Sequence, residues 1–594
     1  MICKEFEGGV TAGILAPLPR TPDVFEEQVT WKLKQDSLFR AELQAENYAS
    51  IDNHLDAVRA KFKEDRDLGL MREYTDKEFF DTFGENTAIS SLAVLVEKDK
   101  LRVLHDGTHK TMVNHRIKCR DKIRMPGVRE KHHLLRTYKE KKLCPLSILG
   151  DVKNAHRLIK IVPEEWGMQA CRLDEGLVWA NMVGTFGIAS AAYWWSRLSG
   201  CLLRCVYGLL GPLNPLDMLL YADDLELLGV SARERNSMVL ALFYLALLGV
   251  PMKLSKFHGG FRVEWIGLYV DYTTYSVGLS EKRAGWLIGW IQGVLKLGKV
   301  GTRDFAGALG RLGFAVTALF YEKAFLGILY LWSGAISSAD AAVVTIPWAV
   351  RLILSWLARR LQGLGRVQEV PLLPIPGGEL FRSDAKAENG RAVIGGWECA
   401  GETPAKLARW YALDVERSWA PWAFAKQNDP GRVIATLELL GTLVSIMAFG
   451  DAWKGKGSGT CCITGSTDNQ GNTYATAKMM SSKWPLTVLL IELSEQLRSR
   501  QMELQLLWRQ RDLNQEADDL TNDIYTSFDL SKRVTIDPAS IPWKVLNEIM
   551  ADSELLYKSI CAEREAAKLS FPGSKKFGFK KMKASLRLRT KDPW

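Results

Sequence analysis

The sequence predicts a multidomain protein of the α+β class, and three observations support that prediction. The chain has 594 residues, which leaves room for roughly three or four domains of ~150 residues each. Hydrophobic residues make up 47% of it and charged residues 25%, a composition typical of folded globular proteins. Strand-like runs alternate with helical patterns in two long regions, and a segment rich in proline and glycine separates the two.

The pattern divides the chain into six segments. In chain order they are a polar, helical N-terminal extension (1–60), an α+β domain (61–275), a mainly helical region (276–367), a linker (368–380), a second α+β domain (381–530) and a basic C-terminal extension (531–594). Ser280 is the expected N-cap of the first helix in the helical region. The linker contains three prolines and two glycines within QEVPLLPIPGGE, which neither a helix nor a central strand tolerates.

Basic residues are concentrated in two stretches of the chain, whose formal net charge is +10. Residues 98–142 contain fifteen Lys and Arg against five Asp and Glu, and residues 571–594 contain eight against one. Clustered basic charge is the pattern expected of a surface that binds a phosphate backbone. A solvated basic face is the alternative, and for the tail the sequence leaves both interpretations open.

The ten cysteines are scattered, without a CxxC pair or a Cys/His cluster of zinc-ligand spacing. Free thiols in a reducing compartment are therefore expected. No signal peptide opens the sequence, and its longest apolar stretch, residues 238–252, is shorter than the ~20 residues that a membrane span needs. These features predict an intracellular protein, cytoplasmic or nuclear, without a membrane partner.

The first candidate site is marked by two adjacent acids. Asp223 and Asp224 stand between two apolar runs, a pattern typical of a β-hairpin with its carboxylates at the turn, and a short apolar strand upstream ends in Asp151. Alone, an Asp-Asp pair is usually just a turn. A few carboxylates on rigid strands, however, can hold the two magnesium ions that nucleotide joining requires. We expect Asp151 and Asp223 to meet in space.

The motifs around these acids resemble the palm of reverse transcriptases from LTR-type, pararetroviral and DIRS-type retroelements. Tyr221-Ala222-Asp223-Asp224 resembles their Tyr-x-Asp-Asp box, Asp151 their first metal-binding aspartate, and Phe186-Gly187-Ile188-Ala189-Ser190-Ala191 their Phe-Gly-x-x-x-Ala motif. Residues 309–315 (LGRLGFA) resemble the thumb of DIRS-like elements. The resemblance extends over about residues 61–330 and implies a right-hand polymerase with fingers, palm and thumb.

The same resemblance implies roles for further residues. Those expected to contact the nucleotide are Lys98, Lys100, Arg102, His156, Phe186, Gly187, Tyr221 and Lys256. Lys98 or Lys100 would accompany the arginine on the triphosphate, and Lys256 resembles a lysine that gives a proton to pyrophosphate. Trp265, Ile266 and Gly267 resemble the tight hairpin that holds the primer end.

One position departs from the family pattern. Five residues after the first aspartate, such enzymes usually have Tyr or Phe, whose ring excludes a ribose 2′-hydroxyl, whereas this chain has His156. An imidazole is smaller and can bond a hydroxyl. Selection of deoxynucleotides is therefore in question, unless a neighbouring side chain supplies the bulk.

Four more acids follow the linker. Asp384 lies at the end of a strand, Glu438 in an apolar helix, Asp468 after an apolar pair, and Asp518 in a late helix, with Asp519 as its alternative. Alone, Asp384 is about as often an ordinary turn residue and Glu438 an ordinary helix residue. In this order they resemble the four acids of the ribonuclease H fold, which has a mixed sheet and holds two magnesium ions that activate water against an RNA phosphate.

The match is most specific at Thr467-Asp468-Asn469 and at Asn514-x-x-Ala517-Asp518-x-Leu520. Many relatives carry a histidine shortly before the second of these motifs, and this chain has Trp508-Arg509-Gln510-Arg511 there. Slow product release is one consequence to expect. Three tryptophans between the first two acids, Trp410, Trp419 and Trp422, are expected to pack on the fold rather than on the nucleic acid.

The sequence thus predicts an RNA-directed DNA polymerase with coupled RNase H cleavage, using two Mg²⁺ (or Mn²⁺) ions per active site. Its expected partners are an RNA template, a DNA primer, the RNA–DNA hybrid and deoxynucleoside triphosphates, and polyprotein or oligomer partners are left open. One alternative is a catalytically impaired, domesticated nucleic-acid-binding protein, which His156 and the absent histidine favour. Another is an RNA-templated RNA polymerase, for which a fused ribonuclease H offers no reason.

Overall fold

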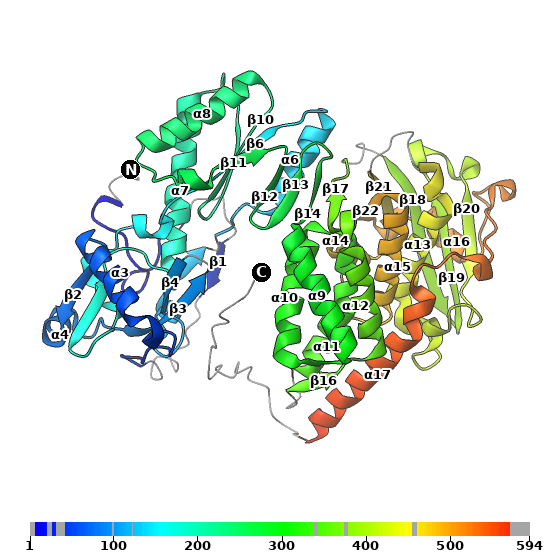
Figure 1. Ribbon diagram of the computed structural model, residues 1–594. Coiled ribbons are helices and arrows are strands. Elements are labelled where there is room, and N and C mark those ends of the chain that lie inside the picture. The colour runs from blue at the N-terminus through cyan, green and yellow to red at the C-terminus, as the bar shows by residue number, and fades with distance from the viewer. Residues whose placement is uncertain are drawn as a thin grey trace. The chain divides into compact units, whose positions relative to one another are not determined.

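The computed structural model describes residues 6–20, 27–30, 42–97, 100–121, 123–337, 342–372, 378–453 and 460–570. They belong to two compact units (Figure 1). The first contains the chain up to Arg129 together with Pro145–Phe261, and the second contains Glu130–Cys144 and the chain from Arg262 on. Both units mix helices with several β-sheets, so the predicted multidomain α+β class is confirmed. Lys98 and the basic stretch 571–594 lie outside the described residues.

The first unit begins with a five-stranded sheet in the order β2-β8-β7-β3-β4. Its strands are β2 (Met71–Thr75), β3 (Ile89–Glu97), β4 (Lys100–Asp106), β7 (Ala170–Cys171) and β8 (Leu177–Asn181), and it is accompanied by α3 (Leu55–Asp67), α4 (Asp76–Phe83), α5 (Val113–Arg116) and the strand pair β1 (Glu27–Thr30) and β5 (Cys119–Asp121). Helix α4 starts where Thr75 and Glu78 form a capping box, which satisfies backbone donors of its first turn.

A second, four-stranded sheet carries the first candidate site. It has the order β11-β6-β10-β9, with β6 (Leu146–Asp151), β9 (Asp217–Tyr221), β10 (Asp224–Gly229) and β11 (His258–Gly260). Helices α7 (Ala189–Leu210) and α8 (Ala232–Leu247) pack on it. Buried side chains of the strands and helices, among them Leu225, Leu227, Trp194 and Met238, form one core.

The second unit opens with a four-stranded sheet and a set of helices. The sheet order is β12-β13-β14-β17, with β12 (Arg262–Trp265), β13 (Leu268–Asp271), β14 (Ser276–Leu279) and β17 (Val367–Glu369). The helices are α6 (Val128–Glu140), α9 (Glu281–Leu297), α10 (Thr302–Ala318), α11 (Leu326–Ile336) and α12 (Trp348–Arg360), with the strand pair β15 (Lys299–Gly301) and β16 (Val343–Thr345). Ser280 caps α9 as expected, since its hydroxyl accepts a bond from the Arg283 amide.

The second candidate site lies in a five-stranded mixed sheet of order β20-β19-β18-β21-β22. Its strands are β18 (Glu379–Glu388), β19 (Arg391–Glu398), β20 (Trp410–Asp414), β21 (Cys461–Thr467) and β22 (Met502–Trp508). Strand β21 runs parallel to β18 and β22, and the remaining pairs are antiparallel. The associated helices are α13 (Ile434–Trp453), α14 (Gln470–Lys478), α15 (Leu486–Arg500) and α16 (Gln515–Thr521).

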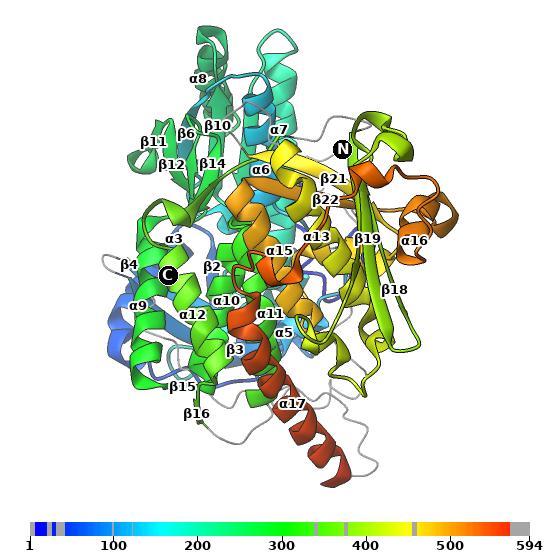
Figure 2. The same ribbon diagram turned by 90° about the vertical axis from the view of Figure 1, so that its right-hand side faces the viewer.

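Two adjacent glycines let helices approach both faces of this sheet. A methyl group at Gly395 would lie 2.8 Å from Leu520 Cβ of α16, and one at Gly396 would lie 2.4 Å from Ser445 Oγ of α13. Successive residues of a strand face opposite sides, so α16 and α13 cover opposite faces, as Figures 1 and 2 show. Asp384 pairs with Gly395 across the strands and therefore faces the same side as α16.

The units do not follow the predicted domain boundaries. One continuous core joins the helices of 276–367 to the five-stranded sheet and to α17 (Leu546–Ser570). The C-terminal segment from 531 is thus not wholly an appendage: the buried carboxylate of Glu492 accepts the amides of Lys544, Val545 and Leu546 at 2.9 Å each, which fixes the start of α17.

Two further boundary predictions need correction. Residues 1–60 are mainly non-helical where they are described: they contain strand β1, a short 3-10 helix (Asp52–His54) and the start of α3 at Leu55. The predicted linker 368–380 contains the end of β17 and the start of β18, because backbone pairing in two sheets takes up its ends. Its residues 373–377 lie outside the described chain.

Segment Pro430–Trp453, which includes α13, is long and apolar enough to cross a membrane by length and composition, with a mean hydropathy of 1.9. However, 78% of that window is buried inside the protein, and the helix carries Glu438 toward the second candidate site. This is the environment of a central core helix. Trp410 and Trp422 are buried too, in keeping with the packing role expected of them.

Candidate active sites

The hairpin of β9 and β10 brings the first three acids together. Asp224 pairs with Tyr221 across the hairpin and with Asp151 across β6, so these acids stand directly opposite each other on neighbouring strands. The Val152 amide donates to the Asp223 carbonyl at 2.9 Å, which fixes the turn beside the end of β6. The expected meeting of Asp151 with the Asp223 turn, 72 residues further on, is therefore present at the level of the backbone.

A tryptophan that the sequence analysis did not single out holds this turn. Ala222 adopts a positive φ of 50°, a conformation that costs energy for any residue other than glycine. The indole Nε1 of buried Trp195, on α7, donates to the Ala222 carbonyl at 2.7 Å. The only signal in the sequence is that Trp195 follows the Phe-Gly motif closely, and that does not identify its partner.

Lys256 provides the positive charge at this site. Its Nζ lies 2.7 Å from Asp151 Oδ1, and the Lys253 amide donates to the Asp151 carbonyl at 2.8 Å. The Asp151 side chain is 10% exposed and that of Lys256 is 52% exposed. Lys256, which is expected to give a proton to pyrophosphate, therefore lies beside Asp151.

The charges shift two pKa values in this group. Burial, with the neighbouring charges of Asp223 and Asp151, raises the pKa of Asp224 to about 6, and Lys256 opposes this shift. Burial lowers the pKa of His156, against the pull of Asp223, so its imidazole is neutral at pH 7. The His156 ring meets Phe186 edge-on with centroids 5.0 Å apart. Phe186 is thus the bulky ring next to the small imidazole.

The loop before α7 packs against β4 with no space for a side chain at Gly187. The residue has a φ of 103°, and a methyl group there would lie 1.6 Å from the His105 carbonyl oxygen. Asn114 holds the loop of Gly187 with two hydrogen bonds. Its side chain donates to the Gly187 carbonyl at 2.5 Å and accepts from the Ala189 amide at 2.8 Å. Close backbone approach is therefore the reason for glycine here. Asn114 carries no signal in the sequence.

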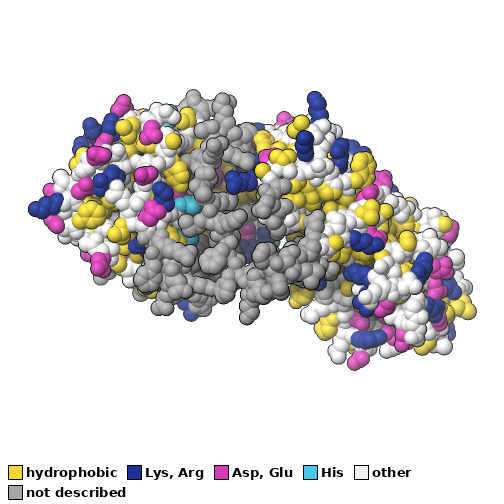
Figure 3. Space-filling view, turned by 90° about the horizontal axis from the view of Figure 1, so that it is seen from below, with side chains coloured by type: hydrophobic (Ala, Val, Ile, Leu, Met, Phe, Trp, Pro, Cys, Tyr) yellow, Lys and Arg dark blue, Asp and Glu magenta, His cyan; other side chains and the backbone are white. Residues whose placement is uncertain are grey.

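The other expected nucleotide contacts are distributed less tightly. Tyr221 is 40% exposed and Arg102 is exposed on β4, whereas the side chain of Lys100 is not described. In the basic stretch 98–142, three residues are engaged within the second unit instead of facing solvent. Lys131 is buried against Trp265 and Tyr272, Arg136 pairs with Glu503, and Lys139 pairs with Glu369. The face in Figure 3 shows Lys and Arg interspersed with Asp and Glu over the described surface.

The hairpin of β12 and β13 corrects one predicted contact. Trp265 is only 2% exposed and lies under the Lys131 ammonium, 4.6 Å from the ring centroid, so its indole packs in the core and is not available to a primer. Ile266 and Gly267 form the turn, with φ values of 47° and 80°. The guanidinium of Arg283 covers Gly267 so closely that a methyl group there would overlap it at 1.9 Å.

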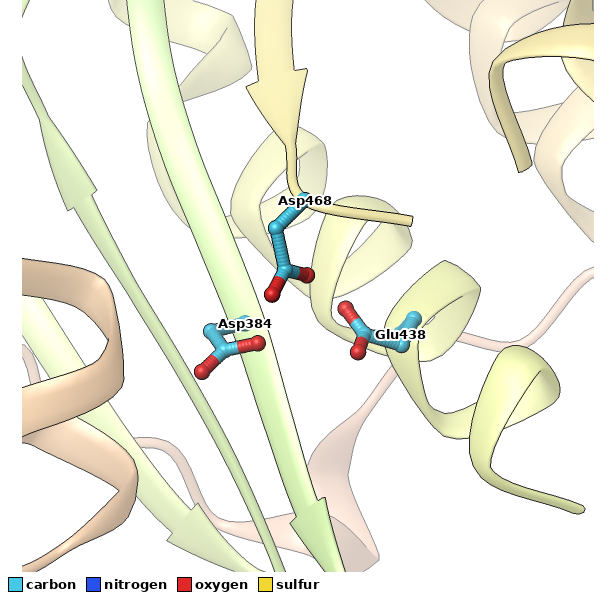
Figure 4. A group of neighbouring side chains, drawn as sticks. All are labelled: Asp384, Glu438 and Asp468. Carbon is cyan, nitrogen blue, oxygen red and sulfur yellow. The ribbon is translucent and has the colours of Figure 1, made fainter. Parts of the chain in front are cut away.

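The second candidate site is an acidic group in the five-stranded sheet. Asp384 comes from β18, Glu438 from the first turns of α13, and Asp468 follows the end of β21. Figure 4 shows the three carboxylates pointing toward one another. Each supplies a ligand oxygen, and these oxygens lie within 4.8 Å of one another. This is the one group of three or more such ligands among the described residues, and Asp151, Asp223 and Asp224 do not form a second.

Mutual repulsion and burial shape the chemistry of this group. Burial together with the charge of Asp468 raises the pKa of Asp384 to about 7. Burial and the other two acids raise the pKa of Glu438 well above its ordinary value, and burial raises that of Asp468 as well. Close carboxylates with raised pKa values are a set of hard oxygen donors, and they suit a divalent ion such as Mg²⁺.

Of the two residues expected as the fourth acid, Asp518 and Asp519, only Asp518 acts on the charges of this group. Asp518 raises the pKa of both Asp384 and Asp468, so its charge faces them. Asp519 instead accepts a bond from Gln515 at 2.8 Å, on the same helix. Asn514 donates to the Ser383 carbonyl at 3.4 Å, next to Asp384, which helps to seat α16 on the strand.

The segment in place of the expected histidine contains two arginines with different partners. Arg509 pairs with Glu379 at 2.7 Å, whereas Arg511 pairs with Asp518 at 2.9 Å. Trp508 is 54% exposed and its indole donates to the Asp468 carbonyl at 3.0 Å. In the sequence these residues stand out only as a departure from the expected motif, and nothing there assigns Arg511 to the site.

Comparisons with known proteins end at the level of the fold. No protein-family model matches the sequence, and no curated protein matches it. Among solved structures, the chain resembles a foamy viral protease-reverse transcriptase in complex with double-stranded DNA, at 12% identity and a TM-score of 0.43, covering 84% of this chain and 75% of that one. A foamy viral protease-reverse transcriptase bound to an RNA/DNA hybrid gives 13% identity and a TM-score of 0.42, covering 80% of this chain and 56% of that one. Likeness at this level establishes neither family nor activity.

Proposed function

We propose that this protein is an RNA-directed DNA polymerase whose second unit cleaves the RNA strand of RNA–DNA hybrids. The observation that carries the proposal is the pairing of Asp151 with the Asp223-Asp224 turn on neighbouring strands. These acids are far apart in the sequence but close in the structure. Their like charges repel and destabilise the fold, so a shared cationic ligand explains their proximity better than a structural role does. The first unit and the hairpin of β12 and β13 would form fingers and palm, and α9 to α12 the thumb and connection.

In this proposal the residues of the first site have separate tasks. Asp151 and Asp223, with Asp224, would hold two Mg²⁺ or Mn²⁺ ions, which supply charge stabilisation at the attacking and leaving oxygens. Gly187, which has no side chain, would let a template and a nucleotide approach the backbone closely. His156 and Phe186 together form the wall beside the sugar. Lys256, whose side chain is half exposed, would give a proton to the leaving group.

The second site is proposed as the ribonuclease H centre. Its support is the buried acidic group on a mixed sheet of order β20-β19-β18-β21-β22, with Asp518 on α16 as the fourth acid. The donor set fits hard divalent ions, and the raised pKa values mean that binding such an ion releases protons. The ions would activate water against an RNA phosphate.

Primer extension tests the polymerase proposal. A primed RNA template is incubated with Mg²⁺ and deoxynucleotides, and we expect extension by the unaltered chain and none by the Asp223→Ala chain. Asp519→Ala is the matched control, because Asp519 bonds only within its helix turn and lies outside both proposed metal sites. Equal extension by the Asp223→Ala chain would reject the assignment.

A second candidate function has one observation in its favour. Lys256 already binds Asp151 Oδ1, and Asp151, Asp223 and Asp224 do not gather their oxygens as the second group does. A catalytically impaired protein that binds nucleic acid would show this arrangement too. Binding of a primed template with undetectable extension, under conditions in which the hybrid is also left intact, would favour that candidate.

A further inference from the structure

Asp518 differs from the other three acids of the second site in how its carboxylate is held. Arg511 Nη2 lies 2.9 Å from its Oδ1, and Asn522 Nδ2 donates to its Oδ2 at 2.9 Å. Asp384, Glu438 and Asp468 turn their oxygens to a common point, and Asp518 is not part of that group. Both oxygens of the fourth acid are therefore occupied by protein donors.

Arg511 is the cation at this site. It begins a short 3-10 helix (Arg511–Leu513) immediately before α16 and its side chain is 75% exposed, against 18% for that of Asp518. Its charge lowers the pKa values of Asp384, Glu438 and Asp468 against the larger effect of burial, so its field reaches the whole acidic group.

The ion pair between Arg511 and Asp518 is easily exchanged. Exposed ion pairs contribute little to stability, because water solvates the separated charges almost as well. A guanidinium also binds phosphate oxygens with two parallel hydrogen bonds, a geometry that a single carboxylate oxygen does not satisfy. A phosphodiester brought to the three converging acids would place such oxygens near Arg511.

We propose that Arg511 is a switching residue: it holds Asp518 in the free protein and transfers to a phosphate oxygen of the bound RNA–DNA hybrid, which releases Asp518 to join the acidic group. No bond is made or broken except hydrogen bonds, and no proton moves. The inference rests on the proposed nuclease function and names the residue that couples substrate binding to completion of the site.

The proposal predicts two effects of opposite sign for Arg511→Gln. Magnesium should bind more tightly, by about three-fold or more, because a positive charge next to the ion is removed and Asp518 is released. The hybrid should bind more weakly, by about ten-fold, because a charge-assisted contact to its phosphate is lost. A residue that merely supports the fold would weaken both.

The experiment uses the full chain with Asp223→Asn, which removes a ligand from the other centre. Magnesium binding is measured by titration calorimetry at pH 8.5, above the pKa of about 7 that burial and Asp468 give Asp384. Hybrid binding is measured by fluorescence anisotropy without divalent ions, so that no strand is cut. Arg509→Gln is the matched control, since Arg509 lies two residues away and pairs with Glu379 at 2.7 Å. Arg511→Lys should restore part of the hybrid affinity.

Unchanged or weaker magnesium binding by Arg511→Gln, or unchanged hybrid binding, would overturn the switch. So would the same pair of changes in Arg509→Gln. Failure of the proposed function looks different: the chain with native residues at both sites would neither bind magnesium at the acidic group nor cleave the hybrid, and the switch would fall with it.

Discussion

The two acidic centres differ in how their negative charge is balanced. At the first, the Lys256 ammonium lies 2.7 Å from Asp151 and stands among the acids themselves. At the second, Asp384, Glu438 and Asp468 share a buried space, and the cation beside them, Arg511, is paired with a fourth acid. At the first centre a lysine thus pairs directly with one of the acids, whereas at the second the three converging acids have no such partner and burial with the charge of Asp468 raises the pKa of Asp384 to about 7.

Two sites built from the same residue type can therefore respond oppositely to the loss of one acid. Removing Asp384 from the second centre relieves repulsion, whereas removing Asp151 from the first leaves Lys256 without its carboxylate. The three predictions that follow test the contrast, beginning with the largest expected effect.

Each centre depends on one glycine, and the two glycines should differ in how much they tolerate. Gly187→Ala would place a methyl group 1.6 Å from the His105 carbonyl oxygen at a φ of 103°, so we expect a loss of at least ~3 kcal/mol in unfolding free energy or a displaced loop. Gly395→Ala meets Leu520 Cβ at 2.8 Å, where α16 can shift, and should cost about 1–2 kcal/mol. Denaturant unfolding measures both.

Gly208→Ala is the control for the glycine pair, because nothing lies within 4 Å of a methyl group there and the residue is inside helix α7. It should leave stability unchanged or raise it by about 0.5–1 kcal/mol. A Gly187→Ala protein as stable as Gly208→Ala would show that the loop is not held against β4.

Asparagine substitutions at the two centres should change stability with opposite sign. Folding raises the pKa of Asp384 to about 7, so the stability tied to its proton is complete below pH 4 and is lost as pH rises through 7. The unfolding free energy of the Asp384→Asn chain should therefore rise relative to that of the unaltered chain between pH 4 and pH 9. At pH 9 the difference should be on the order of 1–4 kcal/mol. Asp151→Asn should lose about 1 kcal/mol or less at the same pH, because the Lys256 partner is half exposed.

Urea unfolding at pH 5, 7 and 9 without divalent ions gives both curves. If the unfolding free energies of both variants changed in the same direction at pH 9, the contrast between the centres would be contradicted. Asp519→Asn, outside both groups, is the control and should leave stability unchanged.

The smallest expected effect concerns the acid limb of primer extension. Lys256 lowers the pKa of Asp224, which burial and two neighbouring acids raise to about 6. Lys256→Gln should therefore shift the acid limb of the normalised pH–rate profile to higher pH. The shift should be less than ~1 pH unit, because the lysine is half exposed. The comparison is made with Lys253→Gln, which shares the loop. A limb that stays in place, or moves to lower pH, would separate Lys256 from the titration of Asp224.

Much of the architecture follows from local sequence pattern. The apolar runs around Asp223 and Asp224 specify a hairpin because alternate side chains must reach the core, and Ser280 specifies a helix start because its hydroxyl replaces a missing backbone partner. The three acids of the second site could be identified one by one, since a charge within an apolar helix or strand, such as Glu438, requires a partner.

What the sequence could not give depends on contacts between distant segments. The alternating pattern around Trp265 predicts a strand. Its burial, however, depends on a contact with Lys131, which lies far upstream in the chain. The extent of the second unit depends on such contacts too, because one core joins α9–α12 to the second sheet and to α17. Arg511 has no local signal at all. The role that we propose for it depends on its ion pair with Asp518 of α16, which only the folded chain forms.

The most direct measurement of the whole account uses one hybrid substrate with separate labels on the DNA primer end and the RNA strand, in the presence of Mg²⁺. The account predicts that Asp223→Ala abolishes growth of the DNA while RNA cleavage continues, and that Asp384→Asn abolishes cleavage, on the order of 10³-fold or more, while growth continues. Loss of both activities in either variant at intact folding, or of neither, would contradict two separate centres built on these acids.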